Sequence, residues 1–161
     1  MSLNKNKFIL NGVLFFCILT LIIAYFIQYV LGYQPCNLCL FERIPYFVAV
    51  IIIPLYFFFN KFQKSILIII AIFFIFGTII SFYHVGIEQG FFSESLVCDL
   101  NGNKNSLTAK DILEEFDKKT VSCKDVKFKV LGLSLATFNT IISLILSAIM
   151  IINIKKYGKN K

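Results

Sequence analysis

The chain has 161 residues, 58% of them hydrophobic, and a mean hydropathy of +0.79. This composition excludes a soluble globular domain, which needs enough polar surface to cover its core. The net charge of +7 does not indicate a nucleic-acid partner, because the basic residues lie at the ends of apolar stretches rather than along one face.

The sequence contains four long apolar stretches. Each is close to the roughly 20 residues that an α-helix needs to cross about 30 Å of hydrocarbon. Backbone polar groups in lipid must be satisfied within the segment, so we expect helices. The prediction is one all-α integral membrane domain over residues 1–161, a bundle of four transmembrane helices at residues 8–31, 40–59, 65–83 and 130–154.

The first stretch also invites comparison with a cleaved signal peptide, because Lys5 and Lys7 precede it. Its apolar run is about twice as long as the hydrophobic region of a signal peptide, and no small-residue cleavage site follows. We therefore expect it to remain as a membrane helix.

The distribution of Lys and Arg predicts the orientation. Basic residues gather at both termini and in the turn between the second and third stretches, all on one side of the membrane. The opposite side has Arg43 and a long loop of mixed charge, residues 84–129. We expect both termini in the cytoplasm and the loop cysteines outside, where disulfides persist. The cytoplasmic basic residues are Lys5, Lys7, Lys61, Lys64, Lys155, Lys156, Lys159 and Lys161.

The long external loop is predicted to contain a short amphipathic helix. Ser106 or Thr108 can cap it, and Ile112, Leu113 and Phe116 share one face. Such a helix beside a membrane is expected to lie in the interface. An ordinary loop helix packed on the protein remains the alternative.

The strongest local motif is Cys36-Asn37-Leu38-Cys39, at the external start of the second stretch. Cysteines at this spacing close and reopen a small disulfide by exchange, and a helix N-terminus stabilises a thiolate. Arg43 follows Cys39 by one helical turn and adds positive charge. The motif therefore favours redox chemistry, although a structural disulfide remains open.

Cys98 and Cys123 form the second external pair, which by itself also fits a static disulfide worth roughly 3–4 kcal/mol. Two pairs on one membrane face favour an electron relay. A zinc site of all four external cysteines would need two close pairs, so we expect no metal. Cys17, inside the first stretch, is expected to be a packing residue.

Residues 34–43 (QPCNLCLFER) resemble the P-C-x-L-C-x-x-E-R signature of the DsbB family of bacterial disulfide oxidases. The resemblance covers nearly the whole chain. Further pieces follow in the family's order: Tyr83-His84, Cys98-Asp99, Cys123 and residues 128–139.

This resemblance implies a multi-pass enzyme of the bacterial inner membrane. It would reoxidise a periplasmic thioredoxin-fold dithiol oxidase of the DsbA type and pass the electrons to a membrane quinone, ubiquinone or menaquinone. An oxidase of the DsbA type has a reduction potential of about −120 mV. Its reoxidation therefore requires an electron acceptor that is a still stronger oxidant.

The resemblance also implies roles for the cysteines. Cys98 would form the mixed disulfide with the partner, and Cys123 is its pair. Cys36 would exchange with that pair, and Cys39 would be the thiolate that reduces quinone.

Two further residues would line the quinone site, Arg43 and His84. Arg43 would stabilise negative charge, and His84 would bind a quinone oxygen or move a proton. A polar residue simply lying at the interface is the alternative for His84. We expect Glu42 to pair with or orient Arg43 rather than to do chemistry.

Three alternatives remain. A thiol oxidase resembling vitamin K epoxide reductase would carry the C-x-x-C after the loop cysteines, whereas here it precedes them. A specialised paralogue of DsbB could serve one dedicated substrate oxidase. A non-catalytic four-span scaffold would hold two inert disulfides.

Overall fold

The fold is taken from a computed structural model. It describes residues 2–59, 62–93, 98, 122–124, 129–130 and 132–159. The predicted interfacial helix, with its proposed caps at Ser106 and Thr108, lies outside these residues.

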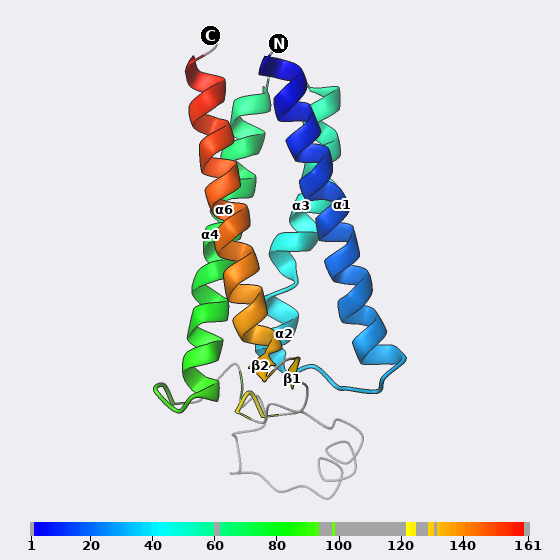
Figure 1. Ribbon diagram of the computed structural model, residues 1–161, viewed down its shortest axis with the longest axis vertical. Helices are drawn as coiled ribbons and strands as arrows, with labels where there is room; N and C mark the ends of the chain where they lie inside the picture. Colours follow the sequence, from blue (N-terminus) through cyan, green and yellow to red (C-terminus); the bar gives the residue numbers. More distant parts are fainter. Residues whose placement is uncertain are drawn as a thin grey trace, which may run out of the picture.

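The described chain is mostly helical, and its long helices run side by side (Figure 1). In chain order the elements are α1 (Ser2–Tyr29), α2 (Asn37–Phe41), α3 (Ile44–Phe58), α4 (Gln63–Glu88), β1 (Lys129–Val130), β2 (Leu133–Ser134) and α6 (Leu135–Lys159).

Four segments of the described chain are long and apolar enough to cross a membrane. The predicted helical architecture with four apolar spans is confirmed. The segments are Lys7–Tyr29, Asn37–Phe58, Gln63–Glu88 and Leu135–Tyr157.

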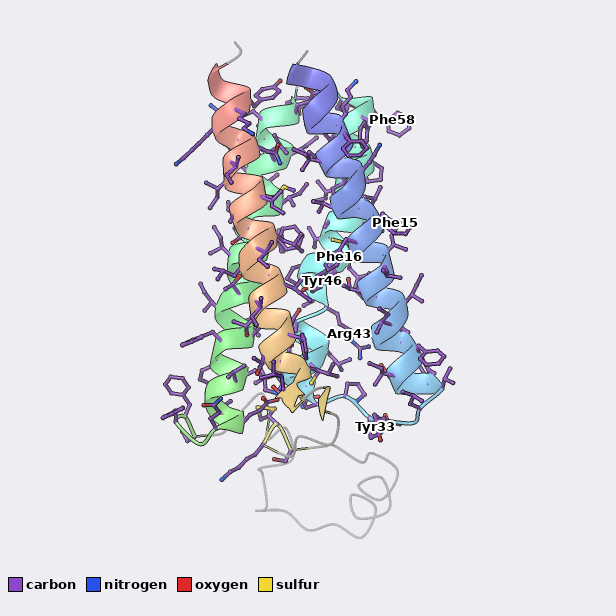
Figure 2. The ribbon with its side chains drawn as sticks, viewed as in Figure 1. Phe15, Phe16, Tyr33, Arg43, Tyr46 and Phe58 are labelled. Atoms are coloured by element: carbon purple, nitrogen blue, oxygen red, sulfur yellow. A yellow bond between two sulfur atoms is a disulfide. The ribbon has the colours of Figure 1, made fainter. Side chains whose placement is uncertain are left out.

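The outer surface of the bundle is apolar, as a lipid-facing surface requires. Phe15 and Phe58 are 70% and 80% exposed and point away from the bundle, whereas Tyr46 points between the helices (Figure 2). Cys17 is fully buried in the apolar core, where the sequence predicted a packing residue.

The second span is interrupted at Glu42 and Arg43, between α2 and α3. Pro45 has no N–H to donate to the preceding turn, and a residue before proline disfavours helical geometry, so one continuous helix is not formed here. At the interruption the Glu42 side chain turns into the bundle, and the Arg43 side chain turns towards α1.

The third span continues to Glu88, so His84 lies within α4 and not in the loop after it.

At the other side of the long loop, β1 and β2 form a small antiparallel hairpin, and Ser134 precedes α6. The Ser134 hydroxyl accepts the backbone N–H of Thr137 at 3.2 Å, which caps the start of α6.

Both chain termini lie at one end of the bundle, and α2 and the hairpin lie at the other (Figure 1). The cysteines at positions 36 and 39 are therefore far from the ends of the chain. This separation agrees with an even number of spans.

Gly77 allows α4 to approach α3 closely. A Cβ atom at Gly77 would lie 2.8 Å from Cγ of Pro45, whereas a Cβ at Gly12 in α1 would meet nothing within 4 Å. We expect Gly77→Ala to lower the stability by about 1–3 kcal/mol through overpacking. Thermal unfolding in detergent measures this, with Gly12→Ala as the matched control. Equal unfolding temperatures for the two variants would contradict the packing argument.

Candidate functional site

Cys36 is the N-cap residue of α2. Its Sγ accepts the backbone N–H of Cys39 at 3.2 Å, and both residues are free thiols. The pKa of the Cys36 thiol is lowered from its ordinary value of 9.0, chiefly by a hydrogen bond from the Cys39 thiol and also by that backbone N–H, against the opposing effect of burial. These hydrogen bonds therefore favour ionisation of Cys36 in the reduced pair.

We expect Cys36 to be alkylated at its maximum rate even below pH 9, because the thiolate is the form that reacts and the pKa of this thiol is lowered. The rate falls only as the pH drops through that lowered pKa. Iodoacetamide labelling of the reduced chain between pH 5 and pH 10, read by peptide mass spectrometry, measures the midpoint. Cys39→Ala removes the thiol donor and should move the midpoint up, towards 9.0; an unmoved midpoint would be evidence against the hydrogen bond as the cause.

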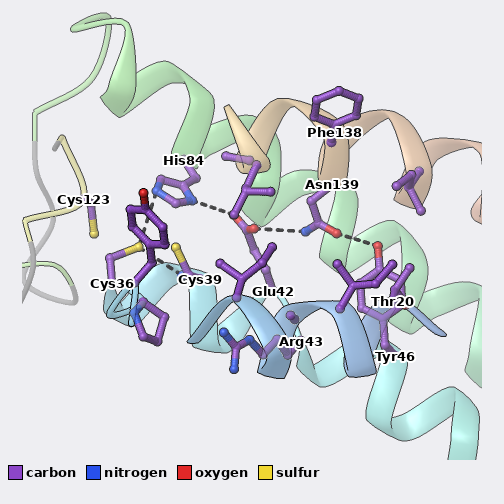
Figure 3. Close-up of a pocket in the computed structure, with 18 of the residues that line it drawn as sticks. Thr20, Cys36, Cys39, Glu42, Arg43, Tyr46, His84, Cys123, Phe138 and Asn139 are labelled. Atoms are coloured by element: carbon purple, nitrogen blue, oxygen red, sulfur yellow. Dashed lines mark hydrogen bonds and ion pairs between the residues drawn. The ribbon is translucent and has the colours of Figure 1, made fainter. Parts of the chain in front are cut away.

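His84 of α4 lies between Cys36 and Glu42. Its Nδ1 is 2.7 Å from Oε1 of Glu42, and its Nε2 is 3.6 Å from Sγ of Cys36 (Figure 3). Because the Glu42 carboxylate accepts from Nδ1–H, Nε2 is the ring nitrogen that faces the Cys36 sulfur, where it accepts from a thiol or, when protonated, donates to a thiolate. His84 and Glu42 are only 2% and 7% exposed, so each is costly to bury without the other.

Asn139 of α6 extends this polar chain into the bundle. Its Nδ2 donates to Oε2 of Glu42 at 3.1 Å and to Oγ of Ser81 at 2.6 Å. Its Oδ1 accepts the hydroxyl of Tyr46, which also lies 3.2 Å from Oγ of Ser143. Both Glu42 oxygens are thus hydrogen-bonded, and three spans are joined around one carboxylate.

Arg43 turns to α1. Its Nη1 donates to Oε1 of Gln28 at 2.7 Å, and its guanidinium carbon lies 5.2 Å from the centre of the Tyr25 ring. The expected pairing of Glu42 with Arg43 is wrong: Glu42 bonds to His84 and Asn139. Side chains of adjacent residues at the break between α2 and α3 point in different directions, which sequence adjacency does not reveal.

A cavity of about 580 Å³ joins these groups. It lies between α1 and α6, and its walls are mainly apolar. Among the predicted site residues, it is lined by Cys36, Cys39, Arg43, His84 and Cys123.

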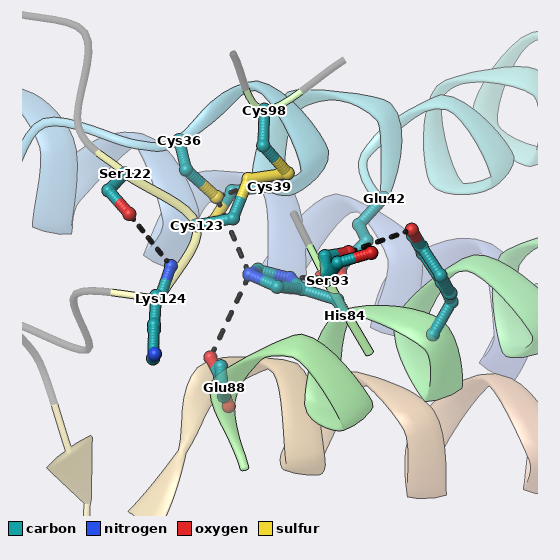
Figure 4. The surroundings of a disulfide bond; sticks show 11 residues. Cys36, Cys39, Glu42, His84, Glu88, Ser93, Cys98, Ser122, Cys123 and Lys124 are labelled. Carbon is teal, nitrogen blue, oxygen red and sulfur yellow. Dashed lines mark hydrogen bonds and ion pairs between the residues drawn. A yellow bond between two sulfur atoms is a disulfide. The ribbon is translucent and has the colours of Figure 1, made fainter. Parts of the chain in front are cut away.

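Cys98 and Cys123 form a disulfide, with Cα atoms 5.7 Å apart (Figure 4). Both are buried in one cluster with Cys36, and Cys39 packs against it. All four predicted cysteines are therefore gathered at the end of the bundle away from the termini.

Sequence reasoning missed Asn139 and Tyr46 and gave Glu42 the wrong partner. A signal for Asn139 was present, because a polar side chain inside an apolar span is expensive and usually functional. The pairing of Glu42 with His84 had no local signal, since it joins residues on different helices.

The comparisons with known proteins agree with this geometry. A profile of the disulfide bond formation protein DsbB matches residues 6–153. An uncharacterized protein of Rickettsia prowazekii (strain Madrid E), RP370, is 30% identical over 148 residues, which cover 89% of this chain and 86% of that protein. No solved structure gives a significant match. The chain belongs to the DsbB family of disulfide bond formation proteins, a family of membrane disulfide oxidoreductases.

Proposed function

We propose that the chain reoxidises a periplasmic thioredoxin-fold dithiol oxidase of the DsbA type and delivers the electrons to a membrane quinone. One observation carries the proposal: the C-x-x-C pair, the Cys98–Cys123 disulfide and His84 meet at a single cavity at the end of a membrane bundle. A scaffold with inert disulfides has no need for a free dithiol beside a buried histidine.

Electrons would enter through Cys98. A thiolate of the partner attacks Sγ of Cys98, the Cys98–Cys123 bond breaks, and Cys123 leaves as a thiolate. The second partner thiol then releases Cys98 and completes the partner's disulfide. The partner has lost two electrons and two protons, which the loop dithiol now holds.

The loop dithiol then reduces the C-x-x-C disulfide. Cys123 attacks Sγ of Cys36, Cys39 leaves, and Cys98 resolves the mixed disulfide. The products are a Cys98–Cys123 disulfide and thiols at Cys36 and Cys39, the pairing described above. Contact of all four cysteines in one cluster supports this transfer.

The cavity suits a quinone. Its volume of about 580 Å³ falls in the range of small-molecule sites, and apolar walls with few polar groups are typical of such sites. Cys39, Arg43 and His84 would hold the head group. When bound, a quinone supplies a lipid-soluble acceptor for two electrons and two protons.

The chain's own residues would manage the protons of that reaction. Glu42 fixes the His84 ring so that Nε2 faces the Cys36 sulfur, where it can hold or move a proton as that sulfur ionises and re-forms its disulfide. Arg43 supplies positive charge on the cavity wall, which favours negative charge developing there. Cys39 completes the cycle by re-forming its disulfide with Cys36.

The proposal also sets the orientation. Exchange with a periplasmic partner requires the cysteine end of the bundle to face outwards and the termini to face the cytoplasm. The lysines near the termini support this arrangement.

A gel-shift experiment tests the proposal against the inert scaffold. The purified chain is mixed with a reduced DsbA-type oxidase, quenched with acid and labelled with a heavy maleimide. We expect the labelling of the four external cysteines to rise within the reaction time and to fall again when quinone is added. Labelling that never changes would identify static disulfides and refute the proposal.

A further inference from the structure

Three soft ligand atoms converge at the cysteine end of the bundle. Sγ of Cys36, Sγ of Cys39 and a ring nitrogen of His84 all lie within 4.8 Å of one another. We propose that these residues, when the two cysteines are reduced, form a binding site for one Zn²⁺ ion that inhibits the chain.

The geometry fits a tetrahedral zinc centre. The Zn–S bond is about 2.3 Å long and the Zn–N bond about 2.1 Å. A sulfur and a nitrogen on one tetrahedral ion are therefore about 3.6 Å apart. Nε2 of His84 and Sγ of Cys36 are 3.6 Å apart. Two ligands come from the start of α2 and the third from α4, so an ion there would join two spans.

The surroundings prepare His84 as a metal ligand. Zinc-binding histidines usually donate their second N–H to a carboxylate, which orients the ring and raises its basicity. Nδ1 of His84 makes this bond with Glu42 at 2.7 Å, and Asn139 holds the other carboxylate oxygen. Nε2 is thereby left to face the sulfurs.

The charge balance also favours a divalent ion. Two thiolates and a neutral imidazole around Zn²⁺ have no net charge, which lowers the cost of burial in an apolar bundle. The fourth position is left for water or for Glu88, whose Oε1 is 3.8 Å from Nε2 of His84. A hard cation such as Mg²⁺ prefers oxygen ligands and would not compete.

Binding would be controlled by the redox state. Zn²⁺ displaces the two thiol protons and forms two Zn–S bonds, with no electron transferred. Oxidation to the Cys36–Cys39 disulfide, with a quinone accepting the two electrons, removes both thiolates and releases the ion. Inhibition of turnover rests on the proposed function, because a bound ion occupies both sulfurs that must pass electrons on; binding itself does not.

From the sequence we expected no metal, and the site considered there was built from the four external cysteines. Here Cys98 and Cys123 are joined to each other, and His84 takes the third ligand position. The site would hold an inhibitor and not a resident cofactor.

The test uses the full chain with Cys98→Ala and Cys123→Ala, reduced, in detergent, and titrated with Zn²⁺ against a chromophoric chelator. We expect one ion per chain, protection of two thiols from maleimide, and recovery on adding EDTA. The oxidised chain should bind none, and Mg²⁺ should give no protection. Co²⁺ in place of Zn²⁺ should give the intense thiolate and tetrahedral bands.

Variants in this background separate the site from a nonspecific dithiol. Glu42→Gln should weaken binding by about 10–100-fold, the effect typical of losing a carboxylate partner, and His84→Ala by at least as much. Thr78→Ala is the matched control on α4, because its hydroxyl bonds to the carbonyl of Phe74, away from the site. It should leave the affinity unchanged.

Several results would overturn the zinc site: no stoichiometric binding, equal binding by the oxidised chain, or unchanged affinity in His84→Ala. If that variant does not fold, an octahedral Co²⁺ spectrum with no thiolate bands in the parent protein overturns it equally. A chain that binds zinc but never reduces quinone would refute the proposed function and leave the site standing. A chain that reduces quinone but binds no zinc would refute the zinc site and leave the proposed function standing.

Discussion

Replacing Cys39 by alanine is expected to abolish quinone-dependent turnover, with a loss on the order of 10⁴-fold or more, the scale on which an essential nucleophile acts. Without Cys39 no disulfide can re-form with Cys36, so electrons that reach Cys36 have no exit. The Cys98–Cys123 disulfide remains able to react with the partner. One partner disulfide per chain should therefore form, without further turnover, while quinone absorbance stays constant.

Cys17→Ala is the matched control, since it removes the third free thiol, which is buried in the apolar core and is not among the residues that line the cavity. It should keep its turnover. Quinone reduction that survives Cys39→Ala at a rate near that of the control would mean that another group passes the electrons on.

Replacing Glu42 by glutamine is expected to lower kcat on the order of 10²-fold, the lower end of what general acid–base groups contribute. The amide has one acceptor in place of two carboxylate oxygens, so either His84 or Asn139 loses its partner. An orphaned buried donor also costs about 1–3 kcal/mol of stability. Stopped-flow absorbance of quinone measures the first effect and thermal unfolding the second.

A purely structural role for Glu42 would lower both exchange with the partner and electron delivery to quinone. A positioning role predicts a split: an unchanged KM for the partner dithiol, a lower kcat for quinone reduction, and partial rescue by Glu42→Asp. Glu88→Gln is the control, because Glu88 approaches His84 only to 3.8 Å. A larger loss in Glu88→Gln than in Glu42→Gln would refute the assignment.

The sequence predicted the membrane architecture because the signal is local. About twenty consecutive apolar residues in each span identify a bilayer-crossing helix without reference to any other part of the chain. The sequence also singled out the four cysteines that the structure brings into one cluster, since paired thiols with a neighbouring Arg43 are unusual in an apolar chain.

The polar network could not be predicted in the same way. The contact between Glu42 and His84 depends on the rotation of α4 against α2, and Asn139 reaches them from α6. Nothing in the spacing of these residues encodes that rotation. The break at Pro45 was also missed as a structural device, although it explains why Glu42 points inwards and Arg43 points to α1.

The sequence also does not show which cysteine of the C-x-x-C pair ionises more readily. Either cysteine near a helix start can be a thiolate on sequence grounds. The N-cap geometry of Cys36, with the N–H of Cys39 on its sulfur, favours ionisation of Cys36 in the reduced pair. That Cys39 is the thiol that reduces quinone stays a prediction, since both Cys36 and Cys39 line the cavity.

The central claim is that electrons from a protein dithiol leave this chain on a membrane quinone. It is tested most directly by mixing the purified chain, in lipid nanodiscs, with a reduced DsbA-type oxidase and a short-chain ubiquinone or menaquinone. Quinone absorbance and the partner's disulfide content are followed together. The account predicts one quinone reduced for each partner disulfide formed; partner oxidation with no quinone consumed would contradict it.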